Sequence, residues 1–284
     1  MGNKTIDIEG KTIGAGSAVH IIAEVGINHD GNMLKAVQLV KEAKNSGADS
    51  VKLQTYITEK RVPKDHPVYD ILKQCELSHQ NQEELFALGN ELGITIFSTP
   101  FDDESVDFLE TLDAPLYKIA SFDTVNKKLL NKVGSTGKPV IMSTGMTNLE
   151  ELGEAWKALG GQDDGTGCDL ALLHCVSSYP LEEMGANLSI INYLHSVHSG
   201  PVGYSDHTIG TKIPVLGVAA GASLIEKHFT LDVDSEGPDH SMSADPNTLR
   251  EIVEKIRWLE EVLGPKEMRI RKAEEDAISY RRPS

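Results

Sequence analysis

Short apolar runs alternate with longer amphipathic runs along almost the whole chain. Eight of the short runs are rich in Val, Ile and Leu: His20–Gly26, Ser50–Thr55, Thr95–Pro100, Leu116–Ser121, Pro139–Thr144, Leu170–Val176, Pro201–Ser205 and Ser223–Thr230. Continuous apolar segments of this length are typical of strands that are covered on both faces. The pattern therefore predicts eight buried strands.

The amphipathic runs between these strands predict helices. They cover Asn32–Ser46, Asn81–Leu92, Asp102–Leu112, Asn126–Val133, Asn148–Leu159, Asn187–Ser196, Thr211–Gly221 and Asp245–Leu263. Each run begins with Asn, Asp or Thr, whose side chain can accept a hydrogen bond from a free N–H group of the first helical turn. We expect these residues to be the N-caps.

Eight strand–helix units in one chain predict an α/β protein with a (β/α)8 TIM barrel. A doubly wound open sheet is the main rival, but its glycine fingerprint is missing. Gly14-Ala15-Gly16 precedes the first strand instead of following it, which predicts a loop. We expect residues 1–264 to form the barrel and residues 265–284 a charged helix or linker. A long insertion, Tyr56–Ser78, follows the second strand, and loops of that length are usually functional or mobile.

The charge of the chain limits its partners. The 284 residues include 27 Lys and Arg and 43 Asp and Glu, so the formal net charge is −16. This charge argues against nucleic-acid binding, which needs a basic surface. No apolar stretch is long enough to span a membrane, and Asp7 and Glu9 interrupt the region where a secretory signal would have its apolar core. We therefore expect a cytoplasmic protein with no membrane partner.

Polar side chains gather where the predicted strands end, which is where barrel enzymes place their chemistry. Lys52 and Lys118 lie inside strands, where a buried ammonium group needs a counter-charge. They suggest a bound phosphate or carboxylate, with Thr99, Ser121 and Ser143 as hydrogen-bond donors. The alternative is that the two lysines pair with carboxylates at the rim of the barrel.

Two histidines at neighbouring strand ends suggest a metal site. His207 and His228 are 21 residues apart, which is one strand–helix unit, and Glu24 and Asp239 belong to the same rim. Two imidazoles together with water and substrate oxygens suit Mn²⁺, Zn²⁺ or Fe²⁺. Strand alternation places Lys227 on the face opposite His228, which argues against Lys227 as a Schiff-base lysine.

The strand-end segments together match one enzyme family. They include Ala23–Gly31, Val51–Thr55, Phe97–Asp102, Tyr117–Ser121, Met142–Met146, Leu173–Cys175, Tyr179-Pro180, Ser205–Gly210, Glu226–Asp232 and Gly237–His240. In these segments the sequence resembles the N-acetylneuraminate (sialic acid) synthase family, which includes legionaminic acid and spore-coat polysaccharide synthases. The resemblance implies a (β/α)8 barrel that condenses phosphoenolpyruvate with an N-acetylated amino-sugar aldehyde, giving a nine-carbon 2-keto acid and phosphate.

The resemblance also implies roles for individual residues. His207 and His228 would hold a divalent ion, most often Mn²⁺ (with Mg²⁺ or Co²⁺ as other options), and Glu24 would be the general base. The positions that match the phosphoenolpyruvate site are Lys52, Thr99, Lys118, Ser121, Ser143 and Tyr179, and those near the amino sugar are Gln54, Tyr179 and Asp239. Ser177 stands where family members commonly have Asn, so we expect a different contact with phosphoenolpyruvate there.

The resemblance further implies a homodimer. Family members usually continue into a small antifreeze-like domain, which we expect to be absent here. The sugar stays open between N-acetylmannosamine and a diacetamido-trideoxyhexose. Two other functions remain as alternatives: a metal-dependent or Schiff-base aldolase with Lys118 as nucleophile, and a non-catalytic sugar-binding homologue.

Overall fold

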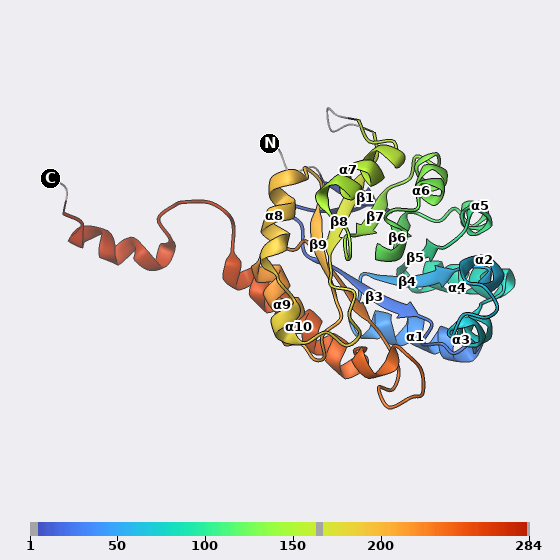
Figure 1. The fold of residues 1–284 in the computed structure, drawn as a ribbon. Helices are drawn as coiled ribbons and strands as arrows, with labels where there is room; N and C mark the ends of the chain where they lie inside the picture. Colours follow the sequence, from blue (N-terminus) through green and yellow to red (C-terminus); the bar gives the residue numbers. More distant parts are fainter. Residues whose placement is uncertain (1–4, 163–166, 283–284) are drawn as a thin grey trace.

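A closed barrel of eight parallel strands forms the centre of the molecule (Figure 1). The structure is a computed structural model that describes residues 5–162 and 167–282. The barrel strands are β3 (His20–Gly26), β4 (Ser50–Thr55), β5 (Thr95–Pro100), β6 (Tyr117–Ile119), β7 (Val140–Ser143), β8 (Leu170–His174), β9 (Val202–Asp206) and β10 (Leu224–His228). β10 pairs with β3 and closes the ring, so the predicted (β/α)8 barrel is confirmed.

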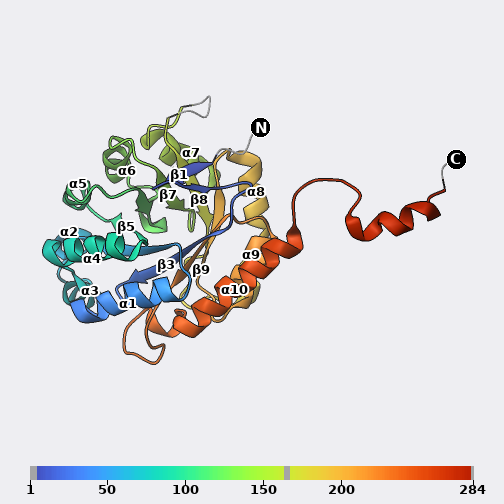
Figure 2. The same ribbon diagram turned by 180° about the vertical axis from the view of Figure 1, so that it is seen from behind.

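In the described part of the chain, eight helices surround the barrel, one after each strand (Figure 2). They are α1 (Met33–Asn45), α4 (His79–Leu92), α5 (Asp103–Thr111), α6 (Lys127–Gly134), α7 (Leu149–Ala158), α8 (Ser189–Val197), α9 (Lys212–Ala219) and α10 (Pro246–Leu263). The helices pack their apolar side chains on the outward residues of the strands. None of the helices in the described part of the chain is long and apolar enough to cross a membrane.

The predicted N-caps are confirmed for five helices and wrong for three. Asn32, Asp102, Asn126, Asn148 and Asp245 each accept a hydrogen bond from a backbone N–H of the first turn. α4 begins at His79 and is capped by Ser78 instead of Asn81. α8 is preceded by Leu188 and not by Asn187, and Thr211 stands at the N-cap position of α9 but makes no cap hydrogen bond with its side chain.

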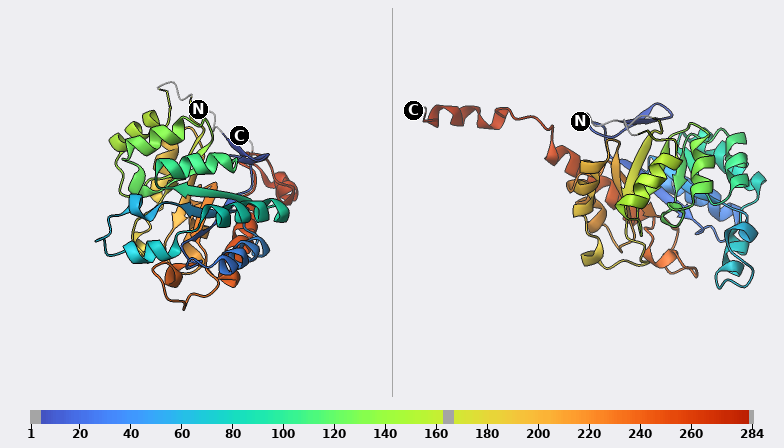
Figure 3. Two further views of the ribbon diagram at one scale, coloured as in Figure 1. Left: turned by 90° about the vertical axis from the view of Figure 1, so that its right-hand side faces the viewer. Right: turned by 45° about the horizontal axis from the view of Figure 1, so that its top comes forward.

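Two short antiparallel strands before the barrel were not predicted. β1 (Ile6–Ile8) and β2 (Lys11–Ile13) form a hairpin through Glu9 and Gly10, both at positive φ, as such tight turns require. Ile6, Ile8 and Ile13 pack with the side chains that fill the barrel interior, such as Phe97. The hairpin therefore covers the end of the barrel opposite the strands' C-terminal ends (Figure 3). The next residues, Gly14–Gly16, form the predicted loop.

The insertion after β4 is folded against the barrel. It contains α2 (Thr58–Arg61) and α3 (Tyr69–Cys75). Ile27, Tyr56, Leu72 and Cys75 form a small apolar cluster that fixes it beside the mouth of the barrel. The insertion is therefore packed beside the mouth of the barrel and does not form a free loop.

Residues after α10 leave the barrel (Figure 1). Residues 264–282 are exposed and include a 3₁₀ helix, η4 (Lys272–Tyr280). The remaining 3₁₀ segments are short: η1 (Ser121–Asp123), η2 (Glu183–Gly185) and η3 (His240–Met242). η1 and η3 follow barrel strands β6 and β10, at the end where the polar side chains collect.

Candidate active site

Side chains alternate between the two faces of a strand, so every second residue of a barrel strand points inward, and near the C-terminal ends these inward residues are polar. Along β3, Ile22 and Glu24 share the inward face, and along β4 the same holds for Lys52 and Gln54. Ile22 belongs to the apolar interior next to the hairpin. The side chains one step further toward the C-terminal ends are polar and buried, so the interior changes from apolar to charged along the barrel axis.

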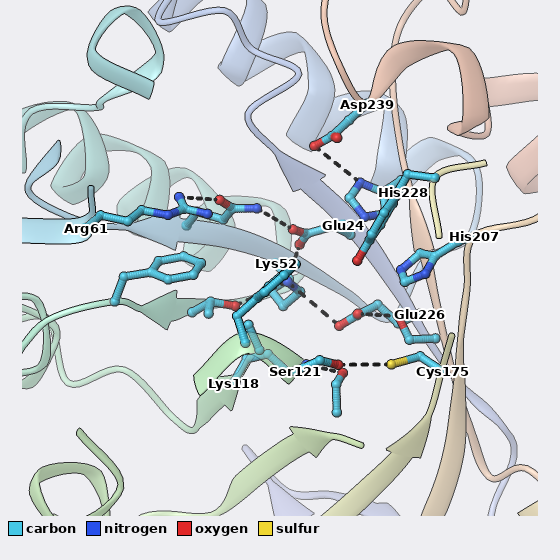
Figure 4. Close-up of a pocket in the computed structure, with 18 residues that line it drawn as sticks. Glu24, Lys52, Arg61, Lys118, Ser121, Cys175, His207, Glu226, His228 and Asp239 are labelled. Atoms are coloured by element: carbon cyan, nitrogen blue, oxygen red, sulfur yellow. Dashed lines mark hydrogen bonds and ion pairs between the residues drawn. The ribbon is translucent and has the colours of Figure 1, made fainter. Parts of the chain in front are cut away.

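A cavity of about 210 Å³ lies at this polar end. It is lined by eleven of the twelve side chains that the sequence analysis assigned to the site: Glu24, Lys52, Gln54, Thr99, Lys118, Ser121, Ser143, Tyr179, His207, His228 and Asp239. Figure 4 shows the charged groups facing one another across this space. Ser177 is the exception. Its hydroxyl is buried without a hydrogen-bond partner in the described residues, and it lies close to two side chains that do line the cavity: a Cβ on Gly145 would come within 2.6 Å of Ser177 Oγ, 2.8 Å of Ser121 Oγ and 2.9 Å of Cys175 Sγ.

The two strand lysines have different partners. Lys52 Nζ lies 2.7 Å from Glu24 Oε2 and 3.9 Å from Glu226 Oε2, and it donates to Thr99 Oγ1 at 3.2 Å. Lys118 Nζ donates to Ser143 Oγ at 2.6 Å and to the Ile119 carbonyl at 2.9 Å. Among the residues that the structure describes, no carboxylate lies within ion-pair distance of Lys118. Lys52 therefore pairs with carboxylates at the rim of the barrel, as the alternative interpretation predicted. Lys118 has no such partner in the described structure and can attract an anion.

Burial dominates the ionisation of these groups. It raises the pKa of Glu24 to about 7, with Glu226 adding to the effect and Lys52 and Gln54 opposing it. Burial lowers the pKa of Lys118. It also opposes the charge on Lys52, but Glu226 and Glu24 outweigh it and raise the pKa of that lysine. A carboxyl group that titrates near neutral pH is suited to act as a general base.

Glu226 and Arg61 line the cavity, although the sequence analysis gave neither a role. Glu226 is buried on β10 and accepts a hydrogen bond from Ser205 Oγ at 2.7 Å. Its pKa is lowered: burial favours the neutral form, but the charges of Lys118 and Lys52 outweigh it. Strand alternation could have identified Glu226, since it shares a face with His228. No sequence signal marked Arg61, which belongs to the insertion.

The two histidine rings stand side by side. Their centroids are 5.6 Å apart, and the ring of Tyr179 lies 4.2 Å from His207. His207 Nδ1 donates to the Val176 carbonyl at 2.7 Å, which leaves Nε2 unprotonated and able to bind a metal. Burial lowers the pKa of both rings and so favours the neutral form that metal ligands need.

The histidine pair fits a divalent metal ion. His228 Nδ1 is buried without a hydrogen-bond partner and lies 3.8 Å from Asp239 Oδ2. Within the described residues, no group of three His, Cys, Asp or Glu side chains comes together as a complete ligand set. The protein would therefore contribute two imidazoles, and water or substrate oxygens would complete the coordination, as in catalytic sites with open positions.

A buried ion pair outside the barrel connects the two histidine strands. Lys227 Nζ lies 2.7 Å from Asp206 Oδ2, and Lys227 also donates to the Thr208 carbonyl. Thr208 Oγ1 donates back to Asp206 Oδ1 at 2.9 Å. Each member of the pair is the chain neighbour of a histidine that lines the cavity, whereas Lys227 itself does not line it. The pair thus fixes β9 against β10 directly behind His207 and His228.

Together, the barrel, the buried carboxyl group of Glu24, the buried ammonium group of Lys118 and the imidazole pair are typical of an enzyme site that takes an anionic substrate. Comparison with known sequences gives the family. The sequence model of the NeuB family matches residues 39–268, and the chain belongs to this family. It is a phosphoenolpyruvate-condensing synthase of the sialic-acid type, and synthases of this family are in general metal-dependent.

Individual relatives cover nearly the whole chain. An uncharacterized protein of Methanocaldococcus jannaschii is 46% identical over 280 residues, which span 98% of this chain and 82% of that protein. An N,N'-diacetyllegionaminic acid synthase of Legionella pneumophila is 40% identical over 269 residues, spanning 89% of this chain and 76% of the relative. The crystal structure of N-acetylneuraminic acid synthetase from Leptospira borgpetersenii has a TM-score of 0.93 and 34% identity, covering 98% of this chain and 96% of that one.

Proposed function

We propose that this chain joins phosphoenolpyruvate to the aldehyde carbon of an N-acetylated amino sugar and adds water, giving a nine-carbon 2-keto acid and phosphate. The sugar is N-acetylmannosamine or a diacetamido-trideoxyhexose. The observation that carries this proposal is one cavity that holds an unpaired buried lysine and a neutral imidazole pair. An anion and a carbonyl compound can then be held next to each other.

The lysine end of the cavity is the proposed site for phosphoenolpyruvate. Lys118 and Lys52 supply positive charge, and the hydroxyls of Thr99, Ser121 and Ser143 supply hydrogen bonds. An anion near Lys118 would compensate a buried ammonium group whose hydrogen-bond partners in the described structure are neutral and which has no carboxylate within ion-pair distance there. The same charges stabilise the phosphate as it leaves. Ser177 does not line the cavity, but its hydroxyl lies close to Ser121 and Cys175, so a contact with phosphoenolpyruvate remains part of the proposal.

The histidine end is the proposed site for the sugar aldehyde. His207 and His228 would hold the divalent ion, for which we propose Mn²⁺, with Mg²⁺ and Co²⁺ as alternatives. When bound, the ion supplies Lewis-acid activation of a carbonyl oxygen. Tyr179 lies against both histidine rings, and Asp239 lies next to His228, so these side chains can orient the sugar.

Glu24 is the proposed base for water addition. Its carboxylate lies between Lys52, at 2.7 Å, and Gln54, whose Nε2 donates to it at 3.1 Å. Positive charge develops at C2 of phosphoenolpyruvate when its C3 forms the new carbon–carbon bond. Ionised Glu24 would stabilise that charge and take the proton from the incoming water.

Phosphate release tests the proposal. The chain is incubated with phosphoenolpyruvate, Mn²⁺ and a panel of N-acetylated hexosamines, and inorganic phosphate and the 2-keto acid product are measured. We expect phosphate release only when an amino sugar and the metal are both present, and none after chelation. Turnover that persists without metal would contradict the role of the histidines, and the absence of turnover with every sugar would refute the proposed reaction.

A Schiff-base aldolase is the second candidate, because burial lowers the pKa of Lys118 as a lysine nucleophile requires. Lys118 Nζ is bonded to Ser143 Oγ and the Ile119 carbonyl, and Lys52 stands in the same cavity. This arrangement favours an anion cradle. Treatment with pyruvate and borohydride distinguishes the two reactions, since a stable adduct on Lys118 is expected only for the aldolase.

We also propose a homodimer. Exposed apolar side chains on α10, such as Trp258 and Val262, both 61% exposed, offer surface that a second subunit could cover. Light scattering at several protein concentrations tests the dimer independently of the activity.

A further inference from the structure

Arg61 reaches the cavity from outside the barrel strands. It is the last residue of α2, in the insertion after β4. The centre of its guanidinium group lies 3.6 Å from the centroid of the Phe101 ring and 4.7 Å from that of Tyr56. Stacking on two aromatic rings fixes the plane and the direction of a side chain that is otherwise flexible.

The guanidinium group of Arg61 has N–H groups that make no hydrogen bond in the described part of the chain. Nη1 donates to Gln54 Oε1 at 3.0 Å, and Gln54 in turn donates to Glu24. A guanidinium group carries five N–H donors. In the described part of the chain this is its one hydrogen bond, so other N–H groups are left for a ligand. In Figure 4 the Arg61 side chain extends toward Glu24 from the side opposite His207 and His228.

Arg61 stands where two cavities meet. A larger cavity of about 620 Å³ lies outside the first and extends under the insertion. Gln54, Arg61, Phe101, Phe122 and Asp239 line both. A ligand that is larger than a three-carbon acid must extend from the inner cavity into this outer one, and it would then pass Arg61.

The charges around Arg61 argue for a neutral ligand at this point. Asp123, Asp239 and Glu24 are the carboxylates that act on the guanidinium group. An anion would be attracted by one positive charge and repelled by three negative ones. A neutral ligand with hydroxyl and amide groups is different, because its oxygens can accept from Arg61 while its O–H or N–H groups donate to Asp239.

We propose that Arg61 is a substrate-binding residue that donates hydrogen bonds to neutral acceptor oxygens of the amino sugar, either a hydroxyl or an acetamido carbonyl. This inference rests on the proposed function, because it assigns the occupant of the outer part of the same site. It distinguishes two ends of the cavity: the two strand lysines bind the anion, and Arg61 binds the sugar.

The test compares Arg61→Met and Arg61→Lys with a control, Lys73→Met. Lys73 lies on α3 of the same insertion, is 46% exposed and pairs with Glu59 and Glu76 outside both cavities. Steady-state kinetics give the KM for each substrate, and calorimetry gives the Kd for phosphoenolpyruvate. We expect the sugar KM to rise at least tenfold in Arg61→Met and less in Arg61→Lys. The Kd for phosphoenolpyruvate stays within twofold, and the control matches the wild type.

Three results would overturn the inference. An unchanged sugar KM in Arg61→Met would contradict the proposed contact between Arg61 and the sugar. A weakened Kd for phosphoenolpyruvate would place Arg61 at the anionic end. A lower kcat with both substrate constants unchanged would make Arg61 a positioning residue that acts on Glu24 through Gln54. If Arg61→Met does not fold, as shown by its Tm, Arg61→Lys keeps the stacked cation and decides the question alone.

Failure of the proposed reaction can be distinguished from failure of the proposed Arg61 contact. If the wild type releases no phosphate with any sugar, the reaction is refuted, and the Arg61 contact is then judged by calorimetric titration of the amino sugars. Loss of measurable sugar binding in Arg61→Met would support the contact even so. A wild type that binds none of the sugars would refute both proposals.

Discussion

Replacing Lys227 by methionine should destabilise the protein strongly and weaken its metal site. The side chains of Lys227 and Asp206 are 1% and 0% exposed, and their charged atoms are 2.7 Å apart. Methionine has nearly the length of lysine but no charge. The substitution therefore leaves the packing almost intact and leaves Asp206 as a buried carboxylate without its counter-charge.

The magnitude follows from the separation and the burial. Two unit charges 2.7 Å apart attract each other by about 6 kcal/mol at an effective dielectric constant of 20. Burying each ion costs several kcal/mol, so the net contribution of the intact pair is small, whereas removing one partner costs about 3–5 kcal/mol. For a chain of this size that corresponds to a fall in Tm of about 6–10 °C.

The double variant Lys227→Met/Asp206→Asn separates charge from packing. It removes both charges and keeps an acceptor for Thr208 Oγ1, so we expect it to recover at least half of the lost stability. Lys212→Met is the matched control. Lys212 is 66% exposed and pairs with Glu183 at the surface, so its loss should change Tm by about 1–2 °C at most.

Two measurements check this prediction. Thermal and urea unfolding give the free energy of unfolding of each variant, and calorimetry with Mn²⁺ gives the metal affinity. Because the pair stands directly behind His207 and His228, we expect about a tenfold to hundredfold loss of affinity in the single variant. A single variant within about 1 kcal/mol of the wild type, or a double variant less stable than the single one, would refute the reasoning.

Three further outcomes are expected. Glu24→Gln should still bind phosphoenolpyruvate but lose at least about a hundredfold in phosphate release, and near-normal turnover would contradict its role as base. The pKa of Glu24 is raised to about 7 and the base works ionised, so kcat/KM should rise with pH up to about 7 and level off above it; full activity at pH 5 would contradict this. His207→Ala and His228→Ala should each remain folded by circular dichroism and lose Mn²⁺ binding by calorimetry, whereas retained binding in either variant would argue against a two-imidazole site.

The periodicity of the sequence was sufficient to predict the barrel and the polar strand ends, whereas the roles of individual site residues came from the family resemblance. Apolar runs mark the strands, and Glu24, Lys52 and His228 occupy inward positions near the strand ends, where a parallel barrel brings side chains together. Ser177 was assigned to the site through the family resemblance. It does not line the cavity, although its hydroxyl lies close to Ser121 and Cys175, so its contact with phosphoenolpyruvate stays a prediction.

The sequence by itself determined the local structure and the residue types available for chemistry, because strand period and buried lysines are properties of neighbouring residues. Only the tertiary structure decided which charges meet. It paired Lys52 with Glu24, left Lys118 without a carboxylate in the described chain, and placed Arg61 at the mouth of the barrel. These outcomes depend on contacts between residues far apart in sequence, whose distances and burial, and hence pKa values, exist only once the barrel has closed.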